Sequence, residues 1–531
     1  MIGRVSDPRE SPFAPWIAWY RGRPRRSYWL TRFLILRLLG LVYLVGFLIL
    51  AFQARPLIGS RGLLPAGLFL DRIARHFGSA LDGFLQYPSL FWWEVSDPFL
   101  VAMAWAGAGL SLLVLAGFAN GVILAILWAL YMSFIHIGQD WYGYGWEIQL
   151  LETGFLAIFL VPVWDARPFP RRPPPAVVIW LFRWLIARIM LGAGLIKLRG
   201  DACWRDLTCL DTHYETQPNP NPLSRYLHHM PHGFQAGGVV LNHLVEMAAP
   251  WFAFGPRLAR HAAGALFVVF QIVLILSGNL SFLNWLTIVP AIACFDDGLL
   301  RRLLPRLLVA RADAAAAAAV PSRAGTFVAA GVALLVAVLS VQPIANLLSD
   351  RQAMNTSFNR LHLVNTYGAF GSVGEVRHEI VFEGTDAVAP DDAARWREYE
   401  FKCKPGDPGR RPCLITPYHY RLDWQIWFAA MSRPDRYPWT VHLVWKLLHN
   451  DPGALSLLAG NPFPDGPPRF IRARYYRYEF APPGDPEGRW WVRTLIGDWI
   501  PPLSADDPRL LRFLQAYGWL EWERRAGAPG P

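Results

Sequence analysis

The stretch that decides the fold is YWLTRFLILRLLGLVYLVGFLILAF, which runs from Tyr28 to Phe52. Its only charged residues are Arg32 and Arg37. An apolar run of about 20 residues is long enough to cross the hydrocarbon core of a bilayer as a helix, and this run exceeds that length. It is also too long for the core of a cleavable signal peptide, so we expect it to be retained as a first membrane span.

Eight more apolar stretches of spanning or near-spanning length follow the first one. They are Pro98–Ala119, Gly121–Gly138, Trp146–Trp164, Ala176–Leu198, Gly237–Phe254, Ala262–Ser277, Asn279–Phe295 and Thr326–Ile344. The composition agrees, because 53% of the residues are hydrophobic, 17% are charged, and 25 are tryptophans, a residue enriched at membrane edges. The sequence therefore predicts a polytopic α-helical membrane protein with about nine spans.

The positions of the basic residues predict the orientation of these spans. The formal net charge is +11, but much of it lies in short loops between apolar runs, as the positive-inside rule requires. The cluster Arg21–Arg26 places the N-terminus in the cytoplasm. Nine alternating spans then put the other basic loops on the same side, those with Arg167/Arg171/Arg172, Arg257/Arg260 and Arg301/Arg302/Arg306/Arg311. The charge is thus explained by topology, and since no nucleic-acid motif is present we expect no nucleic-acid partner.

The character of the chain changes after Ile344, because no further spanning run occurs. Three segments with strand-like alternation, Glu375–Phe382, Arg472–Phe480 and Arg489–Ile496, are separated by stretches rich in turn residues. We expect residues 346–531 to form a mainly-β domain on the extracytoplasmic side.

The remaining division of the chain follows from the spans. We expect residues 1–27 to be a cytoplasmic N-terminus and residues 28–345 to be the transmembrane helical bundle. Within the bundle, residues 298–325 are interpreted as a cytoplasmic linker, because Ala312–Gly325 contains an alanine run followed by Pro321. The alternative is that the alanine run merely extends a helix.

The cysteines indicate the compartment. Cys203, Cys209, Cys403 and Cys413 fall on the non-cytoplasmic side of the predicted topology, and Cys294 falls at the cytoplasmic end of a span. Disulfides persist outside the reducing cytosol, so we expect the pairs Cys203–Cys209 and Cys403–Cys413. Free buried thiols are the alternative, since connectivity cannot be read from sequence. Neither pair has the spacing of a thiol oxidoreductase.

Ionisable residues inside the predicted spans are candidate site residues, because charge at membrane depth is costly. This set comprises Arg32, Arg37, Glu152, Arg183, Arg188, Lys197, His243 and Glu246. Glu152 and Arg183 lie deep and have opposite charge, so a structural ion pair between them is favoured over an active-site role. Arg32 and Lys197 lie near span ends, from which their side chains can reach the headgroups.

His243 and Glu246 are three residues apart and therefore neighbours on one helical face. Two ligands do not make a metal site, and no other metal signature is present in the sequence. We expect no metal and no other cofactor.

Several stretches of the chain are long and idiosyncratic: WEIQLLETGFLAIFL from Trp146, RIMLGAGLIKLRGDACWRDLTCLDTHYETQPNPNP from Arg188, NTYGAFG from Asn365 and YEFKCKPGDPGRRPCLITPYHYRLDWQIWFAA from Tyr399. They resemble the lipase maturation factor family, and the resemblance extends from about Trp29 to Trp519. It implies a polytopic membrane protein that assists the folding and assembly of secreted lipases, with a client lipase and membrane lipid as partners.

The resemblance also bears on location. In animals this family resides in the endoplasmic reticulum membrane, with the C-terminal domain in the lumen. This sequence lacks the long polar N-terminal extension of vertebrate members and an evident retention signal. These departures favour a bacterial homologue in the cytoplasmic membrane, with the endoplasmic reticulum membrane as the alternative.

Two functional hypotheses follow. In the first, a non-enzymatic maturation factor holds apolar client surface with exposed aromatic residues of the C-terminal domain. The candidates are Tyr418, Tyr420, Trp424 and Trp427. The alternative for these residues is that most of them are core, because the domain needs aromatic residues to bury.

In the second hypothesis the chain is a membrane enzyme acting on a lipid or an exported protein. The segment Arg188–Pro222 is similar to part of the membrane domain of the vitamin K-dependent carboxylase, which would make Lys197 a catalytic base. His213 is a second candidate in that site. No nucleotide-binding loop, hydrolase elbow or metal signature supports an enzyme. A polar cavity containing Lys197 would favour this hypothesis, and its absence would favour the first.

Overall fold

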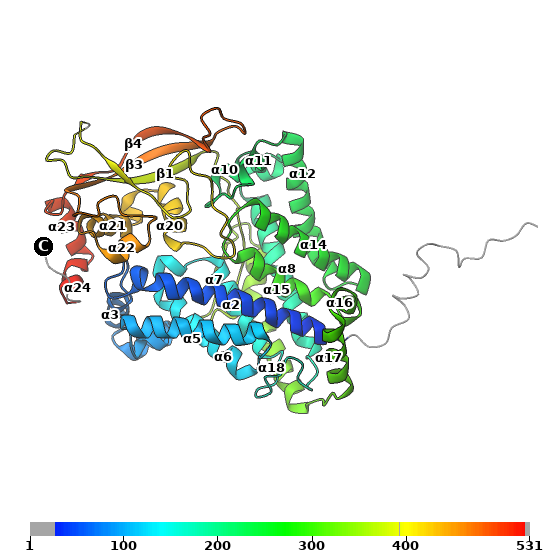
Figure 1. Cartoon of the computed structure of the whole chain (residues 1–531). Coiled ribbons are helices and arrows are strands. Elements are labelled where there is room, and N and C mark those ends of the chain that lie inside the picture. Colours follow the sequence, from blue (N-terminus) through cyan, green and yellow to red (C-terminus); the bar gives the residue numbers. More distant parts are fainter. Residues whose placement is uncertain (1–26, 392, 526–531) are drawn as a thin grey trace, which may run out of the picture.

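Every one of the nine apolar stretches contains helix in the computed structural model, which describes residues 27–391 and 393–525. Five helical segments of this described part are long and apolar enough to cross a membrane. They are α2 (Trp29–Ile58), α5 (Asp97–Ala116), α8 (Ala176–Arg199), α14 (Arg257–Ser277) and the pair α18 (Arg323–Leu339) and α19 (Val341–Leu348). The chain therefore has a helical bundle of the membrane type (Figure 1).

The other four stretches form shorter or interrupted helices. They are α6 (Gly121–Ile137), α7 (Gly145–Ile158), α15 (Leu283–Ala291) with a 3₁₀ turn to Cys294, and α12 (His232–His243), which continues through a π-helical turn (Leu244–Ala248) into α13 (Ala249–Phe252). A helix of 17 residues rises only about 25 Å, less than the hydrocarbon core of a typical bilayer. The count of nine spans thus stays a prediction, with five candidates identified by length and composition.

The first residues of α2 are held by a carboxylate from the start of a helix far along the chain, α16 (Asp297–Leu303). Asp297 accepts hydrogen bonds from the backbone N–H of Trp29 (2.9 Å) and of Leu30 (2.8 Å). A negative charge at this position complements the unpaired N–H groups and the positive end of the helix dipole. Arg32, one turn further along, donates to the carbonyl oxygen of Arg172 at 2.8 Å. The Arg32 side chain therefore binds a loop of the protein, and the prediction that it reaches the lipid headgroups is wrong.

The loops that carry the basic clusters meet at this same end of the bundle. The backbone N–H of Val320 donates to the carbonyl of Arg171 (3.0 Å), and Arg257 is paired with Asp296 (2.7 Å). Helices α16 (Asp297–Leu303) and α17 (Arg306–Ala317) lie beside the start of α2 (Figure 1). The alanine-rich segment is helical as far as Ala317, as the helix-extension alternative expected. Residues 318–322 then form a short non-helical connection to α18.

The C-terminal part contains a four-stranded antiparallel sheet in the order β2-β1-β3-β4. The strands are β1 (Arg377–Thr385), β2 (Arg397–Tyr399), β3 (Phe470–Phe480) and β4 (Trp491–Leu503), which confirms the three predicted strand segments to within a few residues at most ends. The description as mainly β is wrong, however. The helices α20 (Arg421–Ala430), α21 (Trp439–Leu448), α22 (Pro452–Ser456), α23 (Pro508–Ala516) and α24 (Trp519–Arg525) accompany the sheet.

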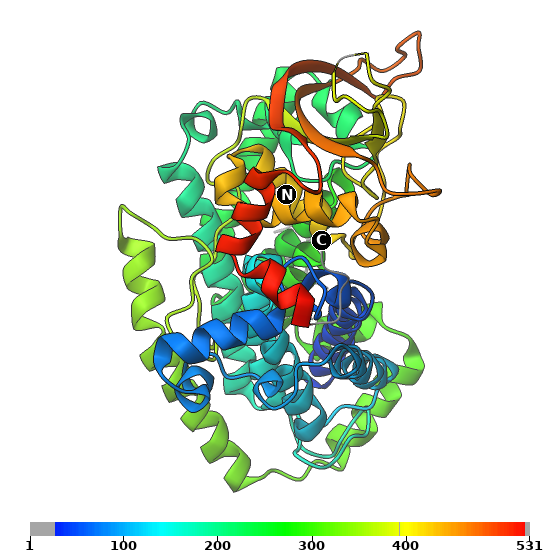
Figure 2. The same ribbon diagram turned by 90° about the vertical axis from the view of Figure 1, so that its left-hand side faces the viewer.

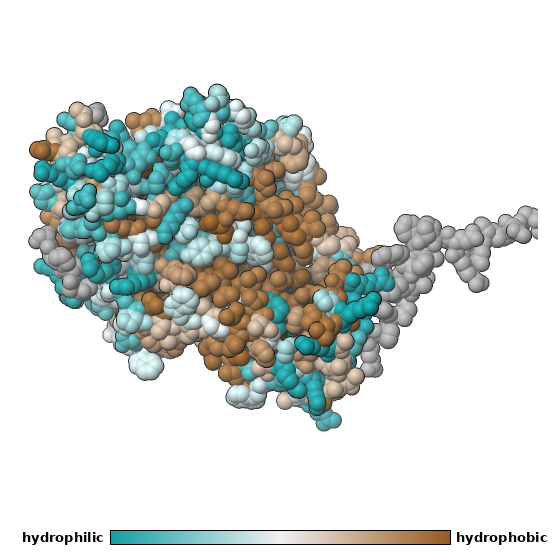
Figure 3. Space-filling view, viewed as in Figure 1, coloured by the Kyte–Doolittle hydropathy of each residue, from teal (hydrophilic) through white to brown (hydrophobic). Residues whose placement is uncertain are grey.

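The C-terminal part packs against the bundle and shares a hydrophobic core with it. Buried residues from both parts, such as Tyr43, Trp141, Trp439 and Phe382, belong to one continuous hydrophobic cluster. Helix α20 contacts β1 on one side and the turn Gln139–Tyr142 of the bundle on the other. Figure 2 shows the sheet and its helices resting on one end of the bundle. On the face seen in Figure 3, apolar side chains gather over the bundle, whereas the C-terminal part is mostly polar.

Candidate functional site

The deepest predicted site residue, Glu152 on α7, lies at the centre of a buried polar network. It forms an ion pair with Arg188 of α8 and accepts hydrogen bonds from the backbone N–H of Asn365 (3.0 Å) and the hydroxyl of Tyr367 (2.7 Å). Arg188 also donates to the carbonyl of Asn365 at 2.7 Å. The stretch NTYGAFG is therefore fastened to two helices of the bundle, and the network is structural in character.

The predicted partner of Glu152 was wrong. Arg183 instead donates to the carbonyl of Ala293 (2.8 Å) and to the hydroxyl of Tyr28 (3.0 Å). Arg183 and Arg188 are five residues apart on α8, which separates their directions by about 140° around the helix axis. Only Arg188 therefore faces α7. The position of a residue along a predicted span does not show in which direction around the helix axis its side chain points.

Lys197 is buried at the end of α8 nearest the C-terminal part. Its ammonium group donates to both carboxylate oxygens of Glu246 (2.6 and 2.8 Å) and to the side-chain oxygen of Asn242 (2.9 Å). Its nitrogen also lies 5.0 Å from the centre of the Trp204 ring. The interpretation of Lys197 as an interfacial anchor is thus wrong, because Glu246 in the π-helical turn draws the side chain inward. An ammonium group has three donors, and three acceptor oxygens lie within hydrogen-bonding distance of this nitrogen.

The two residues weighed as metal ligands, His243 and Glu246, bind different groups. His243 places Nε2 3.0 Å from the carbonyl of Trp204, so His243 and Glu246 have different partners. No group of three or more His, Cys, Asp or Glu side chains able to hold a metal occurs in the described residues. His213 is buried near Lys197, and burial together with that positive charge lowers the pKa of His213 to about 4. It is therefore neutral at pH 7.

Both predicted disulfides are confirmed. Cys203 and Cys209 are bonded with a Cα–Cα distance of 4.7 Å, and Cys403 and Cys413 with one of 5.5 Å. Cys294 is a buried free thiol.

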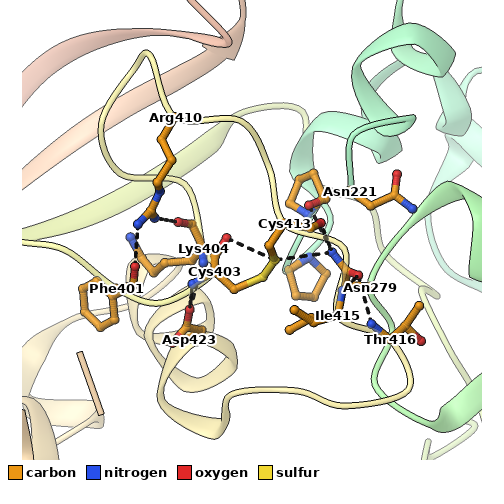
Figure 4. The surroundings of a disulfide bond; sticks show 12 residues. Asn221, Asn279, Phe401, Cys403, Lys404, Arg410, Cys413, Ile415, Thr416 and Asp423 are labelled. Atoms are coloured by element: carbon orange, nitrogen blue, oxygen red, sulfur yellow. Dashed lines mark hydrogen bonds between the residues drawn. A yellow bond between two sulfur atoms is a disulfide. The ribbon is translucent and has the colours of Figure 1, made fainter. Parts of the chain in front are cut away.

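The second disulfide closes a loop that docks on the bundle (Figure 4). Asn279, in the loop before α15, donates to the carbonyl of Cys413 at 2.9 Å and accepts from the backbone N–H of Ile415 at 3.0 Å. On the other side, Asp423 of α20 accepts from the backbone N–H groups of Cys403 (2.6 Å) and Lys404 (2.8 Å). The disulfide loop is therefore part of the junction between the two parts of the chain.

The proposed client-binding aromatic residues face the bundle. Trp424 is only 4% exposed, and its ring centre lies 4.8 Å from that of Trp146. Trp427 is half-buried and donates from its indole nitrogen to the carbonyl of Thr216 (2.9 Å). Tyr418 is half-buried and its hydroxyl accepts from Gln53 at 2.9 Å. The core alternative is right for Trp424, because α20 lies between the sheet and the bundle.

Sequence reasoning missed the ion pair that joins the two parts. Arg421, the first residue of α20, pairs with Glu147 of α7 at 2.8 Å, and both side chains are fully buried. The guanidinium also lies 3.5 Å from the centre of the Tyr142 ring. The only available signal was a charge among apolar and aromatic neighbours in two of the quoted stretches.

A second missed cluster fixes the segment that precedes α11 (Ser224–His228). Arg377 of β1 is paired with Glu379 at 2.6 Å and donates to the carbonyls of Glu215 (2.8 Å) and Pro218 (3.0 Å). Lys404 completes the cluster by pairing with Glu379 at 2.7 Å. The polar, proline-rich segment at positions 213–222 is thus tied to the sheet.

These features define an integral membrane protein with a mixed α/β C-terminal part docked on its helical bundle through buried ion pairs and a disulfide loop. The two parts correspond to two known domains, since residues 30–302 match the lipase maturation factor transmembrane domain and residues 363–501 match the lipase maturation factor C-terminal domain. The chain belongs to the lipase maturation factor family.

Relatives that match most of the chain agree with this assignment. Bovine lipase maturation factor 1 is 51% identical over 92% of this chain and 92% of its own. Human lipase maturation factor 1 is 50% identical over 97% of this chain and 95% of its own. Human lipase maturation factor 2 is 29% identical over 93% and 85%, respectively. No solved structure matches the chain significantly.

Proposed function

We propose that the protein is a membrane-anchored maturation factor that assists the folding and assembly of a secreted lipase. The observation that carries this proposal is the identity of about half of all residues with lipase maturation factor 1 over nearly the whole length of both chains. Fold alone does not fix function, but similarity at this level extends through the bundle, the disulfide loop and the sheet. The arrangement of Lys197 supports a non-enzymatic role, because its donors are all engaged.

The proposal is tested by complementation in cells whose own lipase maturation factor 1 gene is disrupted. Expression of this chain should restore the activity per unit mass of a co-expressed secreted lipase, and human lipase maturation factor 1 at an equal membrane level serves as the positive control. Secreted lipase that stays inactive, while the chain is present in the membrane at that level, would refute the proposal.

We further propose that the N-terminus is cytoplasmic and that the C-terminal part lies on the opposite side, in the endoplasmic reticulum lumen or outside a bacterial cytoplasmic membrane. The clustering of the basic loops at the end of the bundle where α2 begins supports this orientation. The two disulfides support an oxidising compartment for the residues they join.

The orientation is tested with two exposed positions. A cysteine at Val388, which is 82% exposed, should react with a membrane-impermeant maleimide from the non-cytoplasmic side. A matched cysteine at Leu307 on α17 should react only after the membrane is permeabilised. The reverse order of labelling would overturn the orientation and leave the maturation role untouched.

A further inference from the structure

Two short helices between the first two long ones expose an unusual amount of apolar surface. They are α3 (Ala66–Phe77) and α4 (Ala80–Gln86), which form a hairpin and lead through a 3₁₀ turn (Leu90–Trp92) to α5. On α4, the positions 81, 84 and 85 place three apolar side chains on one helical face, and all three are exposed. Large apolar side chains beside them are exposed as well, so that the surface comprises Phe77, Leu81, Phe84, Leu85, Leu90 and Trp93. We call these six residues the hairpin face.

The hairpin face points away from the rest of the protein. Leu81 is 67% exposed and Trp93 is 87% exposed. The opposite side of α4 packs closely instead, since a side chain at Gly83 would collide with the ring of Trp92. Six exposed large apolar side chains within 17 residues are unusual on a protein surrounded by water, and such apolar surface marks a contact with another apolar phase or partner.

Hydrogen bonds fix the level of the hairpin along the bundle. The hydroxyl of Ser89 donates to the carbonyl of Ser133 (2.9 Å), and the backbone N–H of Leu90 donates to the hydroxyl of Ser133 (3.0 Å). Ser133 lies near the C-terminal end of α6. Trp93 lies shortly before Asp97, which is the first residue of α5. The residues that lead from the hairpin to α5 are therefore fixed near the end of α6, where α5 also begins.

The polar side of the hairpin faces the C-terminal part. Arg72 of α3 donates to the carbonyl of Tyr517, and the indole nitrogen of Trp522 in α24 donates to the carbonyl of Ser60 at 2.8 Å. A cavity of about 630 Å³ between α3 and the last two helices is lined by charged side chains of both signs, which include Asp71, Arg72, Arg75 and Glu521. A charged side that includes arginines, opposite a side with Trp, Phe and Leu, is typical of helices that lie in a membrane interface.

We propose that the α3–α4 hairpin is an interfacial anchor, with the hairpin face inserted among the upper acyl chains of the adjacent phospholipid leaflet. Arg72 and Arg75 then lie at the level of the lipid phosphates. Because α24 packs on α3, with Gly67 against the ring of Trp522, the anchor also holds the C-terminal part close to the membrane surface. This role needs no client and goes beyond the proposed maturation function.

The test uses the full chain in phosphatidylcholine nanodiscs, with an environment-sensitive fluorophore on a cysteine at Leu81. Cys294 is buried, so the unaltered chain gives the labelling background. We expect nitroxide lipids labelled near the top of the acyl chain to quench the fluorophore several-fold more than iodide in the water does. A fluorophore at Val388 is the matched control and should show the opposite preference.

A cysteine at Trp93 provides an independent position should the Leu81→Cys protein fail to fold, and it should behave like Leu81. Iodide quenching at Leu81 or Trp93 as strong as that at Val388 would overturn the proposal. So would fluorescence that changes only when a folding lipase is added, because the hairpin face would then be a surface for the client.

Discussion

The helical bundle and the C-terminal part both bury charged residues, but they differ in how visible those charges are from the sequence. In the bundle, Glu152 and Arg188 stand out because they interrupt apolar runs. In the C-terminal part, Arg377 and Arg421 are as fully buried, yet they occur in segments of mixed composition where charge is ordinary. The lipid environment makes every charge in a span conspicuous, whereas a water-exposed part hides its buried charges among many exposed ones.

The comparison also shows where the two parts depend on each other. The buried charges of the bundle do not bind only within it, since Glu152 holds the loop at Asn365 and Glu147 holds α20. A buried ion pair adds little stability over a well-packed apolar pair, but removal of one partner leaves an uncompensated charge. Single substitutions at the junction should therefore reveal the coupling most clearly.

The largest expected effect is that of Arg421→Ala. It leaves the Glu147 carboxylate buried without its partner, which costs about 3–5 kcal/mol. We expect loss of thermal stability of the whole chain, measured by size-exclusion chromatography after heating in detergent. The control is Arg433→Ala, which removes an exposed pair with Asp435 worth about 1 kcal/mol or less. Equal stability of the two variants would contradict a stabilising role of the Arg421–Glu147 pair at the junction.

A similar but more local loss is expected for Lys197→Ala, which leaves Glu246 unpaired at a cost of up to about 3–5 kcal/mol. The double variant Lys197→Met/Glu246→Leu removes both charges and should recover most of the stability and lipase maturation. The single variant, the double variant and the unaltered chain must be present in the membrane in equal amounts for their activities to be compared. A Lys197→Ala protein that is well folded yet inactive, with a double variant that is also inactive, would favour the enzyme hypothesis.

Removal of either disulfide should cause the next largest loss of stability. By the loop-entropy argument, Cys403→Ser/Cys413→Ser should cost roughly 2–3 kcal/mol, and Cys203→Ser/Cys209→Ser slightly less because its loop is shorter. Thermal unfolding under non-reducing conditions measures both, and peptide mass spectrometry checks the pairing. Free thiols at all four positions in protein from its native membrane would contradict the assignment.

The smallest effect concerns pH and Asp423. Burial raises the pKa of Asp423 to about 6, against an ordinary value of 3.8. The folded state therefore binds a proton more tightly than the unfolded state, and this group makes stability fall as pH rises from about 4 to 6. Asp423→Asn should flatten that part of the curve of melting temperature against pH. A curve identical to that of the unaltered chain would refute the role of Asp423.

Much of the fold was predictable because strong local signals exist for it. The run from Tyr28 became α2, the alternation around Arg472–Phe480 became β3, and the cysteines on the predicted outer side paired as neighbours in sequence. The predictions failed where the outcome depended on the direction in which a side chain points. Glu152 was assigned the wrong arginine, Lys197 was directed outward, and Trp424 was placed on the surface, since none of these outcomes depends on local composition.

By itself the sequence determined where the apolar helices and three of the strands lie, and which family the chain resembles. These properties follow from hydrophobic run length, alternation and long motifs, all of which are local. Only the tertiary structure decided that α20 lies between the sheet and the bundle and that Arg421 finds Glu147, 274 positions away. Such a pair forms because two folded surfaces bring the charges together and exclude water, and no local pattern records which surfaces will meet.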